Sequence, residues 1–274
     1  MKGLHTVRAD LEALRLAAEE FGIDKICLMA TYFPLKHSGL HNEELIRRIG
    51  DDPLFSCFGS LNMEAEDLSE GIRELEDFAD KGLISGIKLY PGYQNILLSE
   101  KYFDRVYEIA QAFDLPVACH MGELHHCCPR GAENHRCGKS NCPLDERGDL
   151  AHPRKIADAA ARFPKVKFVA SHLANPYFRE LRVAMRRYPN IYTDISGQFI
   201  SGSDEDTPEY REFLIGEIKD FLLIDGGIDR VMFATDFPIQ SYADSLKLVK
   251  DLGLNERDEE KILSGNALKI IPKR

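Results

Sequence analysis

The stretch PRKIADAAARFPKVKFVASHLANPYFRELRVAMRRYPNIYTDI, residues 153–195, carries the pattern that decides the fold. Its first part, Pro153–Phe163, predicts a helix, because proline suits the first helical turn. Val166–Ser171 and Asn190–Ile195 are short, largely apolar runs that predict buried strands. Phe178–Arg187 lies between them and predicts a second helix. Strands that alternate with helices form a parallel sheet with helical crossovers, so this stretch predicts an α/β fold.

The same alternation extends in both directions along the chain. Further strands are expected at 25–31, 54–61, 84–90, 116–120 and 230–235, and further helices at about 11–21, 42–49, 68–79, 99–110, 210–223 and 242–271. A length of 274 residues suits one (β/α)₈ barrel of ~250 residues. Such a barrel has eight strands and begins with one, whereas only seven are predicted here and a helix comes first. We therefore predict one domain over residues 1–274, a TIM-type barrel that lacks its first strand or is truncated there.

Composition excludes several classes of function. The formal net charge is −10 and the pI is about 5.4, which argues against nucleic acid as the main partner. No apolar run approaches the ~20 residues of a membrane span, and Met1–Asp10 lacks the apolar core of a signal peptide. We therefore expect a cytoplasmic protein that acts on a small molecule. A missing strand would expose the edges of two neighbouring strands, so we also expect a homo-oligomer, most simply a dimer.

Polar residues recur where the predicted strands end, which is the edge of a barrel that carries its chemistry. They are Lys88, Tyr90, His120, His172, Asp194, Ser196 and Asp236. Taken singly, each has a structural explanation: a hydrogen-bonded histidine, an aspartate that caps a turn, or a surface lysine. Their equivalent positions favour a shared site instead, in which His120, His172 and Asp236 hold one divalent cation. Imidazole and carboxylate suit Zn²⁺, which we favour, and also Mn²⁺, Fe²⁺ or Co²⁺.

Several segments together resemble one family. LPVACHMGE, KFVASHLANP, NIYTDISG, RVMFATDFP and ILSGNALKII are similar to the amidohydrolase-related (amidohydrolase 2) branch of the metal-dependent hydrolases, from about residue 23 to residue 271. The resemblance implies a distorted barrel with one divalent metal. By this resemblance His120 is a ligand, Asp236 is a ligand and the general base, and His172 is a ligand or polarises the substrate carbonyl.

The resemblance also implies the chemistry. Members of this branch hydrolyse C–O or C–N bonds through a metal-activated water, often in carboxylate-bearing substrates, and some decarboxylate instead. Lys88, Tyr90 and Ser196 would then contact the substrate, with Lys88 pairing with its carboxylate. A carboxylated Lys88 that bridges two metals is the less favoured alternative.

The chain departs from the family pattern in one respect. The family's first strand carries a His-x-His pair of metal ligands, and none of the nine histidines here forms such a pair. Either the strand lies upstream of Met1, or the barrel is completed differently; His37 and His41 are less favoured substitutes, because Gly39 indicates a flexible loop. With three ligands at most, we expect weak metal binding and low activity. A catalytically degenerate barrel with a binding or scaffold role therefore stays an alternative.

A Cys- and His-rich insert follows His120, at about residues 123–151. Four of the seven cysteines lie in it, and His126, Cys128, Cys137 and Cys142 could hold a second, structural metal. A substrate-covering loop with reduced thiols is the simpler interpretation, and disulfide pairing or a redox switch is a further one. The three other cysteines, Cys27, Cys57 and Cys119, are expected to be inert core thiols.

Overall fold

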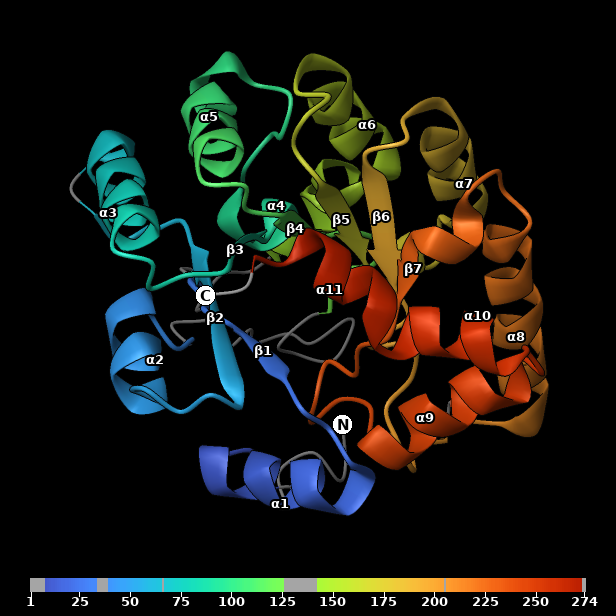
Figure 1. Ribbon diagram of the computed structural model, residues 1–274. Helices are drawn as coiled ribbons and strands as arrows, with labels where there is room; N and C mark the ends of the chain where they lie inside the picture. Colours follow the sequence, from blue (N-terminus) through green and yellow to red (C-terminus); the bar gives the residue numbers. More distant parts are fainter. Residues whose placement is uncertain (1–7, 34–38, 66, 126–141, 205, 273–274) are drawn as a thin grey trace.

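The computed structural model describes residues 8–33, 39–65, 67–125, 142–204 and 206–272. Its centre is a curled parallel sheet (Figure 1) with the strand order β1-β2-β3-β4-β5-β6-β7. The strands are β1 Ile26–Met29, β2 Phe55–Ser60, β3 Gly86–Leu89, β4 Val117–His120, β5 Phe168–Ser171, β6 Ile191–Asp194 and β7 Val231–Met232. In this part of the chain, β1 and β7 are the two ends of the sheet. The predicted α/β barrel truncated at its first strand is confirmed.

Helices surround the sheet (Figure 1) and link consecutive strands. They are α1 Leu11–Phe21, α2 Asn42–Ile49, α3 Leu68–Asp80, α4 Pro91–Gln94, α5 Asp104–Ala112, α6 Pro153–Arg162, α7 Phe178–Arg187, α8 Pro208–Leu222, α9 Tyr242–Asp251, α10 Glu256–Glu260 and α11 Asn266–Ile270. The side chains of Asp10, Asp67, Thr207 and Ser241 each accept a hydrogen bond from a first-turn amide, which fixes where α1, α3, α8 and α9 begin. The helix expected from residue 99 begins later, as a 3₁₀ turn at Lys101–Phe103 that continues into α5.

Two apolar clusters hold the layers together. The larger lies between the sheet and the surrounding helices. The smaller lies inside the curl, where Phe58, Val169 and Met232 from three strands pack with Ile270 of α11. Gly86 makes room for this packing, because a Cβ there would lie 2.2 Å from the Phe58 ring. One end of the curl is therefore filled by side chains, as in closed barrels.

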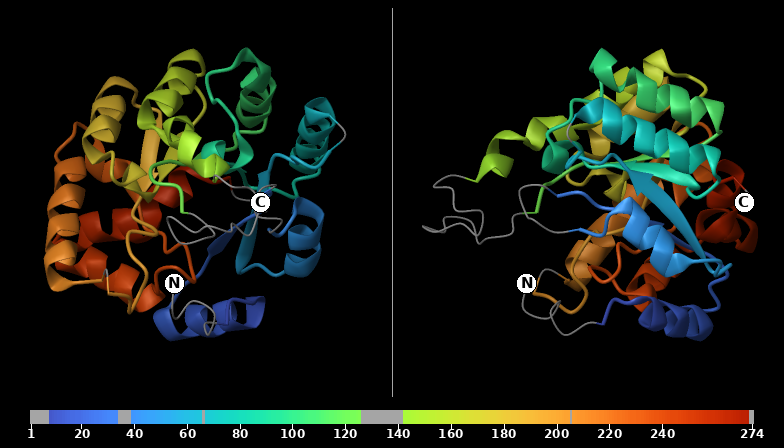
Figure 2. Two further views of the ribbon diagram at one scale, coloured as in Figure 1. Left: turned by 180° about the vertical axis from the view of Figure 1, so that it is seen from behind. Right: turned by 90° about the vertical axis from the view of Figure 1, so that its left-hand side faces the viewer.

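The side of the molecule between β7 and β1 is covered by helices. α1 and α9 lie side by side in both Figure 1 and Figure 2, and the rings of Phe21 and Tyr242 stack with centroids 6.1 Å apart. The ring of helices thus continues across the position where β7 and β1 do not pair. The expected association of two copies at these strand edges stays a prediction.

The two ends of the curl differ. In the right-hand view of Figure 2, α11 lies at one end, and the 3₁₀ turns Pro143–Glu146 and Gly148–Ala151 extend from the other. That second end receives the segment that leaves β4 at His120, so it is the carboxyl edge of the strands. None of the described helices is both long and apolar enough to cross a membrane.

Candidate functional site

A pocket of about 410 Å³ opens at the carboxyl edge of the strands. It brings together His120, His172 and Asp236, the three side chains expected to share a cation. Its other lining residues are Met121, Glu123, His125, Asn175, Gly197, Gln198, Phe199, Ile200, Tyr210 and Ile239. Because the three predicted residues follow three different strands, the parallel sheet is what places them in one cavity.

His120 ends β4 with its side chain buried, only 8% of the residue being exposed. Its Nε2 lies 3.1 Å from the carbonyl oxygen of Glu123, and a carbonyl can only accept, so Nε2 carries the proton. Burial, reinforced by the charges of His172 and Lys88, holds the pKa of His120 well below its ordinary value. The ring is therefore neutral, with Nδ1 as its lone-pair nitrogen.

His172 follows β5 in a turn whose backbone is unusual. His172, Leu173 and Ala174 have φ values of 64°, 52° and 51°, in the left-handed region that non-glycine residues rarely enter. The imidazole of His172 lies next to that of His120, with ring centroids 4.8 Å apart. Strain of this kind persists only where the surroundings enforce it, and it concentrates at functional sites.

Asp236 follows β7, also with a positive φ of 55°. Gly197 sets the space between its carboxylate and His172. A Cβ at Gly197 would lie 3.0 Å from both Asp236 Oδ2 and His172 Nδ1, and Gly197 itself has a φ of 60°. The residue that follows Ser196 is thus glycine for two reasons, its backbone conformation and the close approach of two site side chains.

The other predicted contact residues do not line the pocket. Lys88 is 4% exposed; its Nζ donates to Ser171 Oγ at 2.7 Å and lies 5.3 Å from the centre of the Tyr90 ring. Burial lowers the pKa of Lys88, although the carboxylates of Asp194 and Asp236 oppose this. Ser196 is 3% exposed and bonds to His172. Lys88, Tyr90 and Ser196 lie beneath the pocket surface, and direct binding of substrate by them stays a prediction.

The sequence analysis did not identify three polar residues that form one wall of the pocket, Asn175, Gln198 and Tyr210. Asn175 Nδ2 donates to Tyr210 OH at 2.9 Å and to Gln198 Oε1 at 3.2 Å, and Gln198 Nε2 donates to the Ser196 carbonyl at 2.8 Å. Asn175 and Gln198 each come a few residues after a predicted strand, in the segments SHLANP and DISGQ. Their place after a strand could have indicated them as pocket residues. Tyr210 lies on α8, far along the chain, and no local pattern indicates it.

The fit of a divalent cation depends on donor chemistry and on placement. Each ring donates one N–H to a carbonyl, His120 to Glu123 and His172 to Ser196, so the other nitrogen of each ring is the one that could ligate an ion. That is how metal-ligating histidines are normally held. With the Asp236 carboxylate, the donors are of the right chemistry. In the described ranges, however, no group of three or more His, Cys, Asp or Glu side chains is arranged to hold a metal ion. His120, His172 and Asp236 thus have suitable chemistry but do not form a closed set of ligands as they are placed.

The predicted second metal site lies mostly outside the described residues, which do not include His126, Cys128 or Cys137. Cys142 is described and is buried. Burial raises the pKa of Cys27 to about 11 and the pKa values of Cys57 and Cys119 to about 12, as expected for unreactive core thiols.

Of the two substitute histidines, His41 is described and does not line the pocket. Its ring stacks on Tyr32 at a centroid distance of 4.2 Å. His37 lies outside the described residues.

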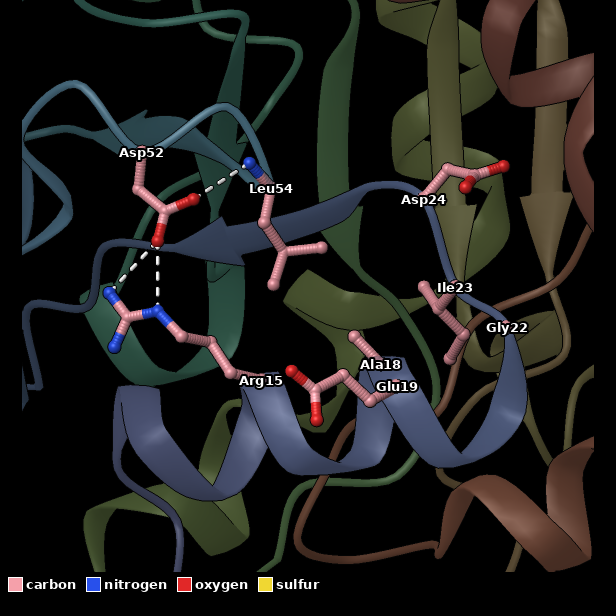
Figure 3. Close-up of a pocket in the computed structure, with 8 residues that line it drawn as sticks. All are labelled: Arg15, Ala18, Glu19, Gly22, Ile23, Asp24, Asp52 and Leu54. Carbon is pink, nitrogen blue, oxygen red and sulfur yellow. Dashed lines mark hydrogen bonds and ion pairs between the residues drawn. The ribbon is translucent and has the colours of Figure 1, made fainter.

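A second hollow of about 370 Å³ (Figure 3) is formed by α1 and the segments that lead into β1 and β2. Arg15 lies in it and pairs with Asp52 at 2.9 Å. This hollow is at the amino edge of the strands, where residues of barrel folds serve stability, and it contains none of the predicted site residues. The candidate site is therefore the pocket at the opposite edge.

Comparison with known proteins adds a family and a set of similar folds. A family model described as Amidohydrolase matches residues 49–273. A search of curated proteins found no match. Among solved structures, an uncharacterised TIM-barrel protein from Bordetella bronchiseptica is 19% identical, with a TM-score of 0.71 over 95% of this chain and 82% of that one.

Two further solved structures are named decarboxylases. The 5-carboxyvanillate decarboxylase from Sphingomonas paucimobilis is 18% identical, with a TM-score of 0.66 over 96% of this chain and 83% of that one. A dihydroxybenzoic acid decarboxylase from Polaromonas sp. with bound manganese is 19% identical, with a TM-score of 0.60 over 96% of this chain and 86% of that one. At these identities the likeness shows a shared fold.

Proposed function

Because the chain belongs to the amidohydrolase family, we propose that it is a metal-dependent hydrolase that cleaves a C–O or C–N bond in a small, carboxylate-bearing substrate. The observation that carries the proposal is the convergence of His120, His172 and Asp236 on one 410 Å³ pocket at the carboxyl edge of the sheet. A pocket of this volume suits a small organic molecule.

In this proposal a divalent cation, Zn²⁺ in preference to Mn²⁺, Fe²⁺ or Co²⁺, is held by His120, His172 and Asp236. When bound, it supplies a Lewis acid that polarises the substrate and makes water acidic enough to ionise near neutral pH. Because these donors do not form a closed set of ligands as they are placed, we expect them to bind the ion weakly.

The chain's own residues perform the proton transfers and the binding. Asp236 accepts a proton from the attacking water on a carboxylate oxygen and passes it to the leaving oxygen or nitrogen. The wall of Asn175, Gln198 and Tyr210 offers hydrogen bonds that orient the substrate. The described lining holds no Lys or Arg, and we assign the substrate carboxylate to Lys88, which is buried and bonded to Ser171.

Decarboxylation at the same site is the second candidate. The names of the two decarboxylases of similar fold support it, as does the need of that reaction for the same elements, namely a bound carboxylate and a group that protonates the carbanion left behind. Asp236 would then take up a proton from water before the reaction and donate it to the carbanion as CO₂ leaves.

The deciding experiment is a product assay. The full chain is treated with chelator, then supplied with Zn²⁺ or Mn²⁺, and offered lactones, amides and aromatic acids that carry a carboxylate. We expect ion-dependent products that have gained one water. Release of CO₂ would support the second candidate, and no turnover with any ion, together with ligand binding to the pocket, would favour a scaffold role.

Gly197→Ala tests the geometry of the pocket. The added Cβ would press on Asp236 Oδ2 and His172 Nδ1, each 3.0 Å from it. We expect kcat/KM to fall by up to about 100-fold while the protein still folds, since both side chains must give way and a displacement near 1 Å costs that much. Gly253→Ala is the matched control, because Gly253 also has a positive φ, 65°, and a Cβ there meets nothing within 4 Å. Equal activity in the two variants would contradict the assigned geometry.

A further inference from the structure

Asp194 lies at the end of β6 and is not part of the pocket surface, with 7% of the residue exposed. Its Oδ1 accepts three hydrogen bonds: from the His172 amide at 3.0 Å, from the Ser196 amide at 3.1 Å, and from the Ser196 hydroxyl. A single oxygen therefore joins the turn after β5 to the segment after β6. An oxygen that accepts from two backbone amides is an acceptor only, so the Ser196 hydroxyl must be the donor to it.

The direction of the bond from Ser196 to Asp194 also determines how Ser196 contacts His172. Since the single hydroxyl proton of Ser196 points to Asp194, Ser196 Oγ can only accept from His172 Nδ1, which lies 2.8 Å away. The Ser196 carbonyl, 3.2 Å from the same nitrogen, can likewise only accept. Both contacts require a proton on His172 Nδ1. A neutral His172 therefore keeps its lone pair on Nε2.

The bond from Asp194 to the His172 amide has a second effect. It holds the first of the three consecutive residues whose φ values are positive, a conformation that non-glycine residues keep only when their surroundings enforce it. The turn is also closed by its own backbone bond from the Asn175 amide to the His172 carbonyl at 2.9 Å, and the bond to Asp194 adds to it by tying the turn to β6.

We propose that Asp194 is a positioning residue, which clamps the strained turn at His172 and, through Ser196, fixes the tautomer that leaves Nε2 of His172 available to the pocket. The use of Nε2 for a cation or a substrate rests on the proposed function. The tautomer does not, because it follows from contacts within the chain itself.

The test is the tautomer itself, read by ¹⁵N NMR of histidine side chains in the full chain at alkaline pH. The His172 signal is assigned by its loss in His172→Gln. We expect the Nδ1–H form in the wild type. An Nε2–H form there would overturn the proposal without any further variant being made.

Three variants distinguish the proposed positioning role of Asp194 from a general role in folding. Asp194→Ala removes the acceptor, which releases the turn that holds His172 against the Ser196 carbonyl and frees the Ser196 hydroxyl to donate to Nδ1, so we expect a shift toward the Nε2–H form or a mixture. Asp194→Asn keeps an amide oxygen at that position and is expected to retain the Nδ1–H form. Ser196→Ala keeps its carbonyl and is also expected to retain it. An Asp194→Ala protein that folds and keeps the wild-type signal would refute the clamp. If Asp194→Ala does not fold, loss of the Nδ1–H form in a folded Asp194→Asn refutes it, and retention there supports it.

Activity gives an independent reading. Asp194→Ala should lower kcat by about 10–100-fold with a smaller change in KM, as is typical when the partner of a site histidine is lost. Asp194→Asn should recover much of it. Failure to find any substrate would count against the proposed function, while the tautomer measurement would still decide the role of Asp194.

Discussion

Asp236→Asn is expected to lower kcat by about 10²–10⁴-fold and to leave the fold intact. The amide has nearly the same shape as the carboxylate and can occupy the same space beside Gly197. It cannot accept a proton from water or neutralise a cation, so both roles proposed for Asp236 are lost together. Turnover is measured with the substrate identified in the product assay, and folding by circular dichroism and thermal unfolding.

The matched control is Asp229→Asn. Asp229 is an aspartate outside the pocket, paired with Lys269 at 3.0 Å between the side-chain nitrogen and oxygen. The Asp229→Asn variant should retain full activity, because an exposed ion pair contributes little to stability and this pair lies away from the site. If Asp236→Asn keeps more than about a tenth of wild-type activity, proton transfer by Asp236 is the wrong mechanism.

Arg230→Met is expected to cause a large loss of stability. Arg230 is 7% exposed, and its guanidinium donates to backbone carbonyls, not to a carboxylate. The acceptors are Met185 and Asp225 at 2.7 Å, Ile191 and Gly226 at 3.3 Å, and Tyr188 at 3.4 Å. The side chain thus joins the end of α7, the start of β6 and the turn before β7.

Methionine fills much of the volume but donates no hydrogen bond. The carbonyls of Tyr188 and Gly226 keep backbone donors, the amides of Ile191 and Asp229, so the loss falls on the others. Each buried carbonyl left without a donor costs about 1–3 kcal/mol, and we expect the free energy of unfolding to fall by about 3–5 kcal/mol. That is a large share of the ~5–15 kcal/mol that stabilises a typical domain. Urea denaturation measures the change, provided the slope of the transition is unaltered.

Arg186→Met, on the exposed face of α7, is the control and should change stability by less than about 0.5 kcal/mol. The free energy of unfolding of Arg230→Lys should lie between those of the wild type and Arg230→Met, because an ammonium can reach fewer of the five carbonyls. A loss below about 1 kcal/mol in Arg230→Met would show that these carbonyls find other partners, such as water.

The elements that sequence predicted well are those with a strong local pattern. Predicted strand 116–120 is observed as Val117–His120, and predicted strand 230–235 shortens to Val231–Met232. Directly after Met232, the amide of Phe233 donates to the carbonyl of Ile262 in the C-terminal helical segment and not to a strand. Helix 153–163 is observed as Pro153–Arg162.

The candidate site was predictable only in part. His120, His172 and Asp236 could be named because each follows an apolar strand, and parallel strands end at one edge. Lys88 has the same sequence signal, yet it lies under the pocket and bonds to Ser171. Whether a strand-end side chain reaches the cavity depends on the neighbours above it, which come from other segments.

By itself, the sequence determined the order of strands and helices, the parallel sheet and the identity of the three pocket residues, because these depend on apolar periodicity and on helix caps among near neighbours in the chain. Only the tertiary structure decided which ring nitrogen of each histidine is free, why residue 197 is glycine, and that Asn175, Gln198 and Tyr210 share a wall. Those properties are set by distances of about 3 Å between atoms of remote segments, at which hydrogen bonds form and Cβ atoms clash. No local pattern encodes such distances.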